Sequence, residues 1–244
     1  NYENVPQVTA LSPSIGPSSG GTVVTVTATP FNGDDDTTRI GYGEFIDRST
    51  LTCRFDDSQL VPAVFKSKFE VECEVPSHAE GTVTVSVSNN GVDFGNGLVF
   101  LYTGEPFVEA IYPSIGSIVG GLPLSVKAGG LPLASNLVNG VEAVYMCRFT
   151  NTNSNDTTSV DIAASYSSIN TISCPTPPST ALNLPVNDVS SVQLRVSSNA
   201  VDFSKSFALF LYAQKATVNS FSPKWVPEET PTQVSLFGIN FPLS

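Results

Sequence analysis

The chain has 244 residues, of which 41% are hydrophobic and only 14% are charged, with a formal net charge of −11. This length accommodates two or three domains with ordinary hydrophobic cores. The acidic balance argues against a nucleic-acid partner, because phosphate backbones repel such a chain. No apolar run approaches the roughly 18 residues of a membrane span, so we expect no membrane insertion of this segment.

The first hundred residues contain several runs in which apolar and polar side chains alternate. This period of two predicts half-buried β-strands. The clearest run is 69–75, where four apolar residues face one way and three glutamates face the other. Similar strands are expected at 51–55, 83–88 and 100–102. Asn90-Gly91 favours a tight hairpin turn, since both residues tolerate positive φ.

The pattern then repeats over the second hundred residues. A Ser-Ile-Gly segment preceded by Pro13 returns at Pro113, and each is followed by a Gly-Gly pair. A third start contains Pro223, so the spacings are 100 and 110 residues, the size of a domain. We predict modules at 1–104 and 105–214 and a truncated third module at 215–244, and we expect the full protein to continue.

The predicted joints between modules are short, at 103–105 and 213–216. Joints of three or four residues restrict hinge motion and favour a rod of modules arranged end to end. An ordinary flexible linker is the alternative.

Each complete repeat holds two cysteines. Four cysteines allow three pairings, and the repeat favours Cys53 with Cys73 and Cys147 with Cys174. One pair per domain on facing strands suits a disulfide inside a sandwich, and oxidised cysteines imply an extracellular, secreted protein. The alternative is four buried free thiols. Metal binding is disfavoured, because no CxxC motif occurs and the chain has one histidine.

Other candidate sites are weaker. Asn155 opens an N-glycosylation sequon in a polar stretch. Trp225 is a candidate partner contact, although such an aromatic more often packs at a domain joint. Asp34–Asp36 is interpreted as a solvated loop rather than a calcium site, and His78 as a loop residue rather than a catalytic base. Asp93 and Asp202 recur at the hairpin, where we expect each to bond nearby turn backbone.

The ordered series of motifs, repeated along the chain, resembles the IPT/TIG family of immunoglobulin-like modules, which occurs in plexins, related receptors and some transcription factors. The series runs from the Ser-Pro opening and the Gly-Gly turn through Cys-x-Phe, a second Cys with a nearby Pro, and an Asn-x-x-Asp-Phe hairpin to a closing Tyr. Gly238-Ile239-Asn240-Phe241 in the third copy also matches a family motif. The resemblance implies an all-β fold of tandem sandwiches with about seven strands each.

We therefore expect a non-enzymatic extracellular structural or adhesion protein, without cofactors, catalytic residues or metal. Its expected partners are proteins, either copies of itself in a filament or other cell-surface proteins. The alternatives are a stalk segment of a plexin-like receptor and an accessory module of a secreted polysaccharide-degrading enzyme. DNA binding, as in the transcription-factor members, is disfavoured by the net charge of −11.

Overall fold

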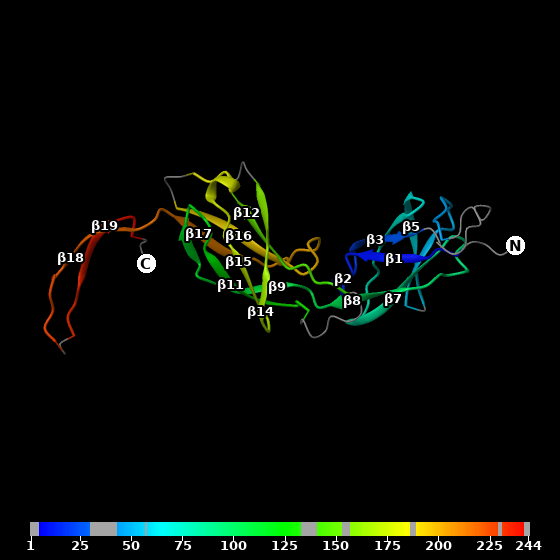
Figure 1. Ribbon diagram of the computed structural model, residues 1–244, viewed down its shortest axis with the longest axis horizontal. Helices are drawn as coiled ribbons and strands as arrows, with labels where there is room; N and C mark the ends of the chain where they lie inside the picture. The colour runs from blue at the N-terminus through cyan, green and yellow to red at the C-terminus, as the bar shows by residue number, and fades with distance from the viewer. Residues whose placement is uncertain are drawn as a thin grey trace.

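The fold is that of a computed structural model, which describes residues 5–29, 43–56, 58–132, 141–152, 157–185, 189–228 and 231–241. Two β-sandwiches follow one another along the long axis, and a two-stranded sheet extends beyond the second (Figure 1). Across these ranges the chain forms strands and one 3-10 turn but no α-helix. The expected all-β fold of immunoglobulin-like modules is therefore confirmed.

The first module is a sandwich whose strands occur in the order β1-β3-β6-β5-β4-β7-β8-β2. The alternating residues described above build these strands, with apolar side chains inside and hydroxyl or charged side chains outside. The strands are β1 (Val8–Ser12), β2 (Ile15–Pro17), β3 (Val23–Ala28), β4 (Thr52–Phe55), β5 (Gln59–Ser67), β6 (Glu70–Glu74), β7 (Gly81–Ser88) and β8 (Leu98–Thr103).

Strand β5 joins the two layers of this sandwich. Its first half pairs with β4, and its second half, from Ala63, pairs with β6. A single nine-residue strand thereby closes one side of the sandwich. Strand β2 closes the other end of the series by pairing in parallel with β8, Ile15 opposite Leu101.

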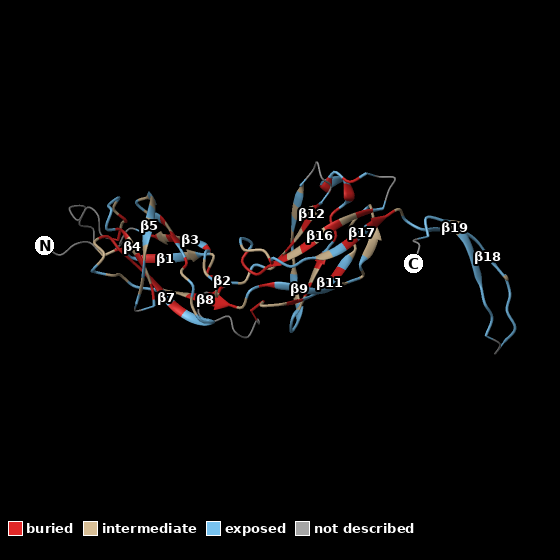
Figure 2. Ribbon diagram, turned by 180° about the vertical axis from the view of Figure 1, so that it is seen from behind, coloured by how far each residue is buried: buried red, intermediate tan, exposed pale blue. Residues whose placement is uncertain are grey.

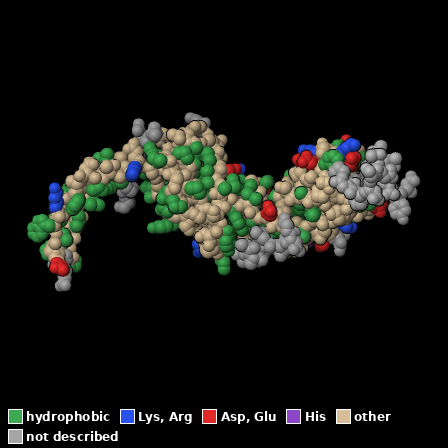
Figure 3. All heavy atoms as spheres, in the orientation of Figure 1, with side chains coloured by type: hydrophobic (Ala, Val, Ile, Leu, Met, Phe, Trp, Pro, Cys, Tyr) green, Lys and Arg blue, Asp and Glu red, His purple; other side chains and the backbone are tan. Residues whose placement is uncertain are grey.

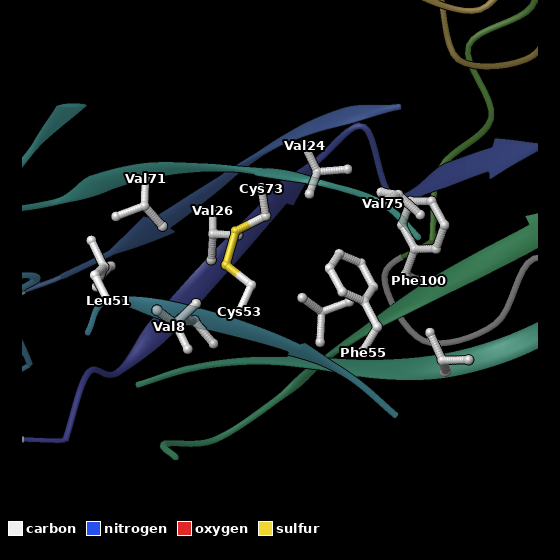
Figure 4. Packing of buried hydrophobic residues seen from close by; sticks show 14 of the residues in the cluster. Val8, Val24, Val26, Leu51, Cys53, Phe55, Val71, Cys73, Val75 and Phe100 are labelled. Atoms are coloured by element: carbon white, nitrogen blue, oxygen red, sulfur yellow. A yellow bond between two sulfur atoms is a disulfide. The ribbon is translucent and has the colours of Figure 1, made fainter. Parts of the chain in front are cut away.

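The first core lies between these two layers and contains residues of the first module alone. Val24 and Val71 are fully buried from one layer, and Phe55 and Phe100 from the other. Figure 4 shows these side chains around the sulfur bridge at the centre of the core. This module therefore has a hydrophobic core of its own, as an independently folding domain requires.

The second module repeats the plan with one interruption. In place of β5, two short strands pair with separate layers, β13 with β12 and β14 with β15, with Ala164 between them. Its core is again its own. The elements are β9 (Phe107–Tyr112), β10 (Ile115–Ser117), β11 (Pro123–Gly129), β12 (Met146–Asn151), β13 (Ser159–Ala163), β14 (Ser165–Ser168), β15 (Thr171–Pro175), the 3-10 turn η2 (Ser179–Leu182), β16 (Ser190–Ser197) and β17 (Ala208–Ala213).

The third segment is a hairpin of β18 (Thr217–Ser222) and β19 (Ser235–Ile239). Ser222 pairs with Ser235, as Ser12 pairs with Thr25 in the first module, so the third copy has the same register. Its apolar side chains are exposed, as the pale-blue strands in Figure 2 and the hydrophobic surface in Figure 3 show.

The joint between the modules as the candidate functional site

Two disulfides lie at the centres of the two sandwiches. Cys53 on β4 bonds to Cys73 on β6, with Cα atoms 6.4 Å apart. Cys147 on β12 bonds to Cys174 on β15, with Cα atoms 6.5 Å apart. Each bond connects the two layers of its sandwich, and each sulfur pair is buried in the core. The bridges therefore constrain the modules individually and do not connect them.

A tight turn after β16 is a part of the second module that contacts the first module. The Oδ1 atom of Asn199 accepts hydrogen bonds from the backbone N–H groups of Val201 and Asp202, at 3.0 and 2.8 Å. Its Nδ2 group donates to Oδ2 of Asp202 at 2.7 Å. The asparagine therefore holds the turn backbone, and the prediction that the aspartate does so is wrong. Asp202 instead keeps its carboxylate free for a further donor.

That donor comes from the first module. The Thr22 hydroxyl donates to Oδ2 of Asp202 at 2.6 Å, across 180 residues of sequence. Asn199 also donates through Nδ2 to the backbone carbonyl of Ile15 at 2.9 Å. The backbone N–H of Glu142 donates to the Ser14 hydroxyl at 3.1 Å. Thr22 is fully buried, so its hydroxyl has exchanged water for this carboxylate.

Apolar contacts complete the interface. Ile15 and Leu101 of the first module pack with Val141 of the second in a small cluster separate from the two main cores. Ile15 is completely buried although it lies at the end of its own sandwich. We call the set Ser14, Ile15, Thr22, Leu101, Val141, Glu142, Asn199 and Asp202 the joint.

The connection beside the joint is short and close-packed. Strand β8 ends at Thr103 and β9 begins at Phe107. A Cβ atom on Gly104 would lie 3.3 Å from the Cα of Gly130, and one on Gly130 would collide with the backbone of Glu105. Gly130 also has a φ of +71°, which favours glycine. The connection therefore packs closely against the second module at Gly130.

A groove of about 700 Å³ opens beside this connection. Both modules line it, with Glu80 and Tyr102 on one side and Phe107 and Leu131 on the other. Across the described ranges, no group of three or more His, Cys, Asp or Glu side chains is placed to hold a metal ion. The groove follows from the meeting of the two modules.

His78 lies beside this region but has a structural role. Its ring stacks on Tyr102 with centroids 4.9 Å apart, and Nδ1 lies 2.8 Å from the carbonyl oxygen of Ala79. Its ring contacts are therefore an aromatic ring and a backbone carbonyl.

Of the three glutamates on β6, Glu72 pairs with Lys66 at 2.8 Å.

Two tyrosine hydroxyls make contacts that the sequence does not predict. The hydroxyl of Tyr102 donates to the carbonyl of Pro76 at 2.9 Å, and that of Tyr212 donates to Pro177 at 2.6 Å. Burial raises the pKa of Tyr102 to about 12 and raises that of Tyr212 as well, because the buried site disfavours the phenolate. The recurrence of the closing Tyr in both repeats is the sequence signal that could have indicated a common structural role for these two residues.

The remaining predicted positions are distributed as follows. Trp225 is 79% exposed and stands 210 residues after Ile15, at the corresponding point of the third copy. Asp34–Asp36 and Asn155 lie outside the described residues. None of the helical segments that the structure describes is long and apolar enough to cross a membrane.

Comparison with known proteins agrees with the fold of the modules. Residues 6–102 match the family model of the IPT/TIG domain. Plexin-A2 of Homo sapiens is 29% identical over 154 residues, which are 60% of this chain and 7% of that protein. Plexin-A2 of Mus musculus is 30% identical over the same share of each chain. The chain thus spans about a fourteenth of the curated relatives that it matches.

Among solved structures, the full extracellular region of plexin A4 is similar with a TM-score of 0.50 and 18% identity. The match covers 88% of this chain and 16% of that one. At this identity the likeness concerns the fold, and it extends over both sandwiches. Residues 6–102 are an IPT/TIG domain, and a second immunoglobulin-like module of the same plan follows it.

Proposed function

We propose that this segment is a non-enzymatic extracellular structural or adhesion element. It acts as a rod of disulfide-stapled immunoglobulin-like modules that mediates protein–protein assembly at a cell surface or in an extracellular filament. The observation that carries the proposal is the joint, where three hydrogen bonds and an apolar cluster connect modules that already share the chain. A flexible tether between independent domains needs no such contacts.

The joint gives the rod a defined bending stiffness. Bending at residues 104–106 separates the Thr22 hydroxyl from Asp202 and the Asn199 amide from Ile15. A hydrogen bond to a charged group contributes about 1.5–3 kcal/mol, and a neutral one about 1 kcal/mol. Because Thr22 is fully buried, opening also breaks a bond formed away from water. Thermal bending of the joint is therefore suppressed, and the distance between the far ends of the two modules is maintained.

The disulfides support the extracellular assignment and the mechanical role. Each closes a loop of 20 or 27 residues across its sandwich. Such bridges persist in oxidising compartments. A bridge that connects the layers also limits how far a module extends when the chain is pulled. The similarity to the plexin extracellular region points to the same compartment.

A second candidate function is a stalk of a plexin-like receptor, in which the modules hold a ligand-binding domain away from a membrane. The 29% identity to plexin-A2 favours this candidate. Both candidates need the stiff joint, but they differ in what the exposed surfaces do. An assembly element associates with itself or with other proteins through its surfaces, whereas a stalk segment remains monomeric.

Sedimentation velocity of the secreted, oxidised chain distinguishes the two. The assembly proposal predicts a weight-average sedimentation coefficient that increases with concentration, with both disulfides intact by non-reducing mass spectrometry. A chain that stays monomeric at every concentration and fails to adhere to cell surfaces would overturn the assembly proposal and leave the stalk. A variant with charged side chains at exposed Phe221 and Trp225 separates specific assembly from adhesion through the exposed third segment.

A further inference from the structure

The first module carries a second copy of the turn that docks in the joint. Asn90 stands where Asn199 stands in the second module, and Asp93 where Asp202 stands. The Oδ1 atom of Asn90 accepts from the N–H groups of Val92 and Asp93 at 2.9 and 2.8 Å, and its Nδ2 donates to Asp93 at 2.8 Å. The two turns therefore have the same internal hydrogen bonds.

The hairpin residues after the two turns are also anchored alike. Arg54 lies over the ring of Phe94, 4.2 Å from its centroid, and Arg148 lies over Phe203 at 3.7 Å. A cation over an aromatic face holds the hairpin against the sheet. The turn of the first module is thus rigid before any partner arrives, and an ordered surface loses little entropy on binding.

Burial distinguishes the two turns. Asn199 is buried and Asp202 is half-buried, whereas their counterparts Asn90 and Asp93 are half-buried and exposed. The free turn lies at the start of β8, and the joint lies at the end of that strand. The chain therefore presents one occupied copy and one unoccupied copy of the same docking element.

We propose that the Asn90–Asp93 turn is a docking surface for the β2 end of another module of this type. The occupant presents a threonine hydroxyl at the position of Thr22 and an unpaired backbone carbonyl at the position of Ile15. Asp93 accepts from that hydroxyl and Asn90 donates to that carbonyl, as Asp202 and Asn199 do in the joint. This inference rests on the proposed function, for which it names the partner.

One difference makes the docking weaker than the joint. Val141, which packs on Ile15, lies six residues before Cys147, and the residue six before Cys53 is Asp47. Asp47 is exposed. The apolar part of the joint is therefore missing, and polar contacts carry the association. We expect it to be reversible and to depend strongly on the two polar side chains of the turn.

The test uses the first module alone as the occupant. Its core, disulfide and strand pairings all lie within residues 8–103, so the fragment 1–104 contains its complete sandwich. Removing the second module uncovers Thr22 and Ile15. The fragment carries Asn90→Ala and Asp93→Ala, which prevents it from docking onto itself. It is added unlabelled to the full 15N-labelled chain, and amide chemical shifts are followed.

The expected result is saturable shifts at Asn90–Asp93 of the labelled chain. The substitution Thr22→Val in the fragment weakens binding about tenfold, because it removes a hydrogen bond to a carboxylate. A matched fragment with Glu70→Ala, on an exposed β6 position, binds unchanged. Asn90→Ala with Asp93→Ala in the labelled chain abolishes the shifts.

Absent shifts with a folded, oxidised fragment would overturn the proposal, as would shifts that both turn variants leave intact. Neither result changes the sedimentation behaviour of the whole chain, which tests the proposed function separately. A chain that self-associates without shifts at this turn retains the proposed function and loses this docking surface.

Discussion

Replacing Thr22 by valine removes one hydroxyl from the joint and leaves its shape unchanged. The hydroxyl donates to Asp202 at 2.6 Å from a fully buried position, so no water replaces the lost bond without repacking. Asp202 retains its bond from Asn199. Hydrogen bonds to charged groups contribute about 1.5–3 kcal/mol. We expect a coupling free energy near the lower limit, about 1.5 kcal/mol, because Asp202 is partly exposed to solvent.

A double-mutant cycle of Thr22→Val and Asp202→Ala isolates this coupling. Urea unfolding is followed by NMR cross-peaks of each module, since a two-domain chain need not unfold in one step. The matched control combines Thr22→Val with Asp93→Ala, which breaks the equivalent turn bond away from the joint. The control pair is expected to be additive within about 0.5 kcal/mol. Additivity of the Thr22 and Asp202 variants as well would refute the assignment of this bond to the joint.

Three further predictions concern stability and stiffness. Because burial raises the pKa of Tyr102 from 10.0 to about 12, the folded state holds the phenol proton more tightly than the unfolded chain. The stability that this proton contributes is complete below pH 10 and is lost as the pH rises towards 12. Urea midpoints should therefore decline over this pH range, and Tyr102→Phe should flatten the decline. An unchanged decline in the variant would contradict the assignment of the effect to Tyr102. Replacing both Cys53 and Cys73 by alanine should lower the free energy of unfolding of the first module by about 3–4 kcal/mol and leave that of the second module unchanged. Urea titration of the oxidised chain measures both values. Equal losses in both modules would contradict separate cores. Gly130→Ala should loosen the joint, because its φ of +71° and the backbone of Glu105 exclude a Cβ atom; faster independent tumbling in 15N relaxation is expected, and unaltered tumbling would argue against close approach.

The sequence predicted the all-β fold well because its signals are local. Alternation at 69–75 and the recurring Ser-Pro and Gly-Gly pairs each lie within a few residues, and they recur at domain spacing. The continuous strand β5 was less accessible. Leu60 and Val64 are apolar but exposed, so the sequence pattern does not show which face of the strand is buried. The reason is that the strand changes partners half-way along its length.

The joint could not be predicted from sequence for a similar reason. Thr22 and Asp202 are 180 residues apart, and a threonine after two glycines carries no indication of its partner. Even the repeat misleads at this point, because Leu122 replaces the threonine in the second module. Asp93 and Asp202 occupy the same position of the repeated hairpin motif, yet only Asp202 bonds to the neighbouring module.

Residual dipolar couplings of the oxidised chain test whether a bonded joint holds the two modules in one orientation. Backbone N–H couplings are fitted to the first and second modules separately in the same alignment medium. We expect a single alignment tensor to describe both modules, because the joint fixes their relative orientation. Two tensors of different magnitude or orientation would show independent modules and would contradict the rod.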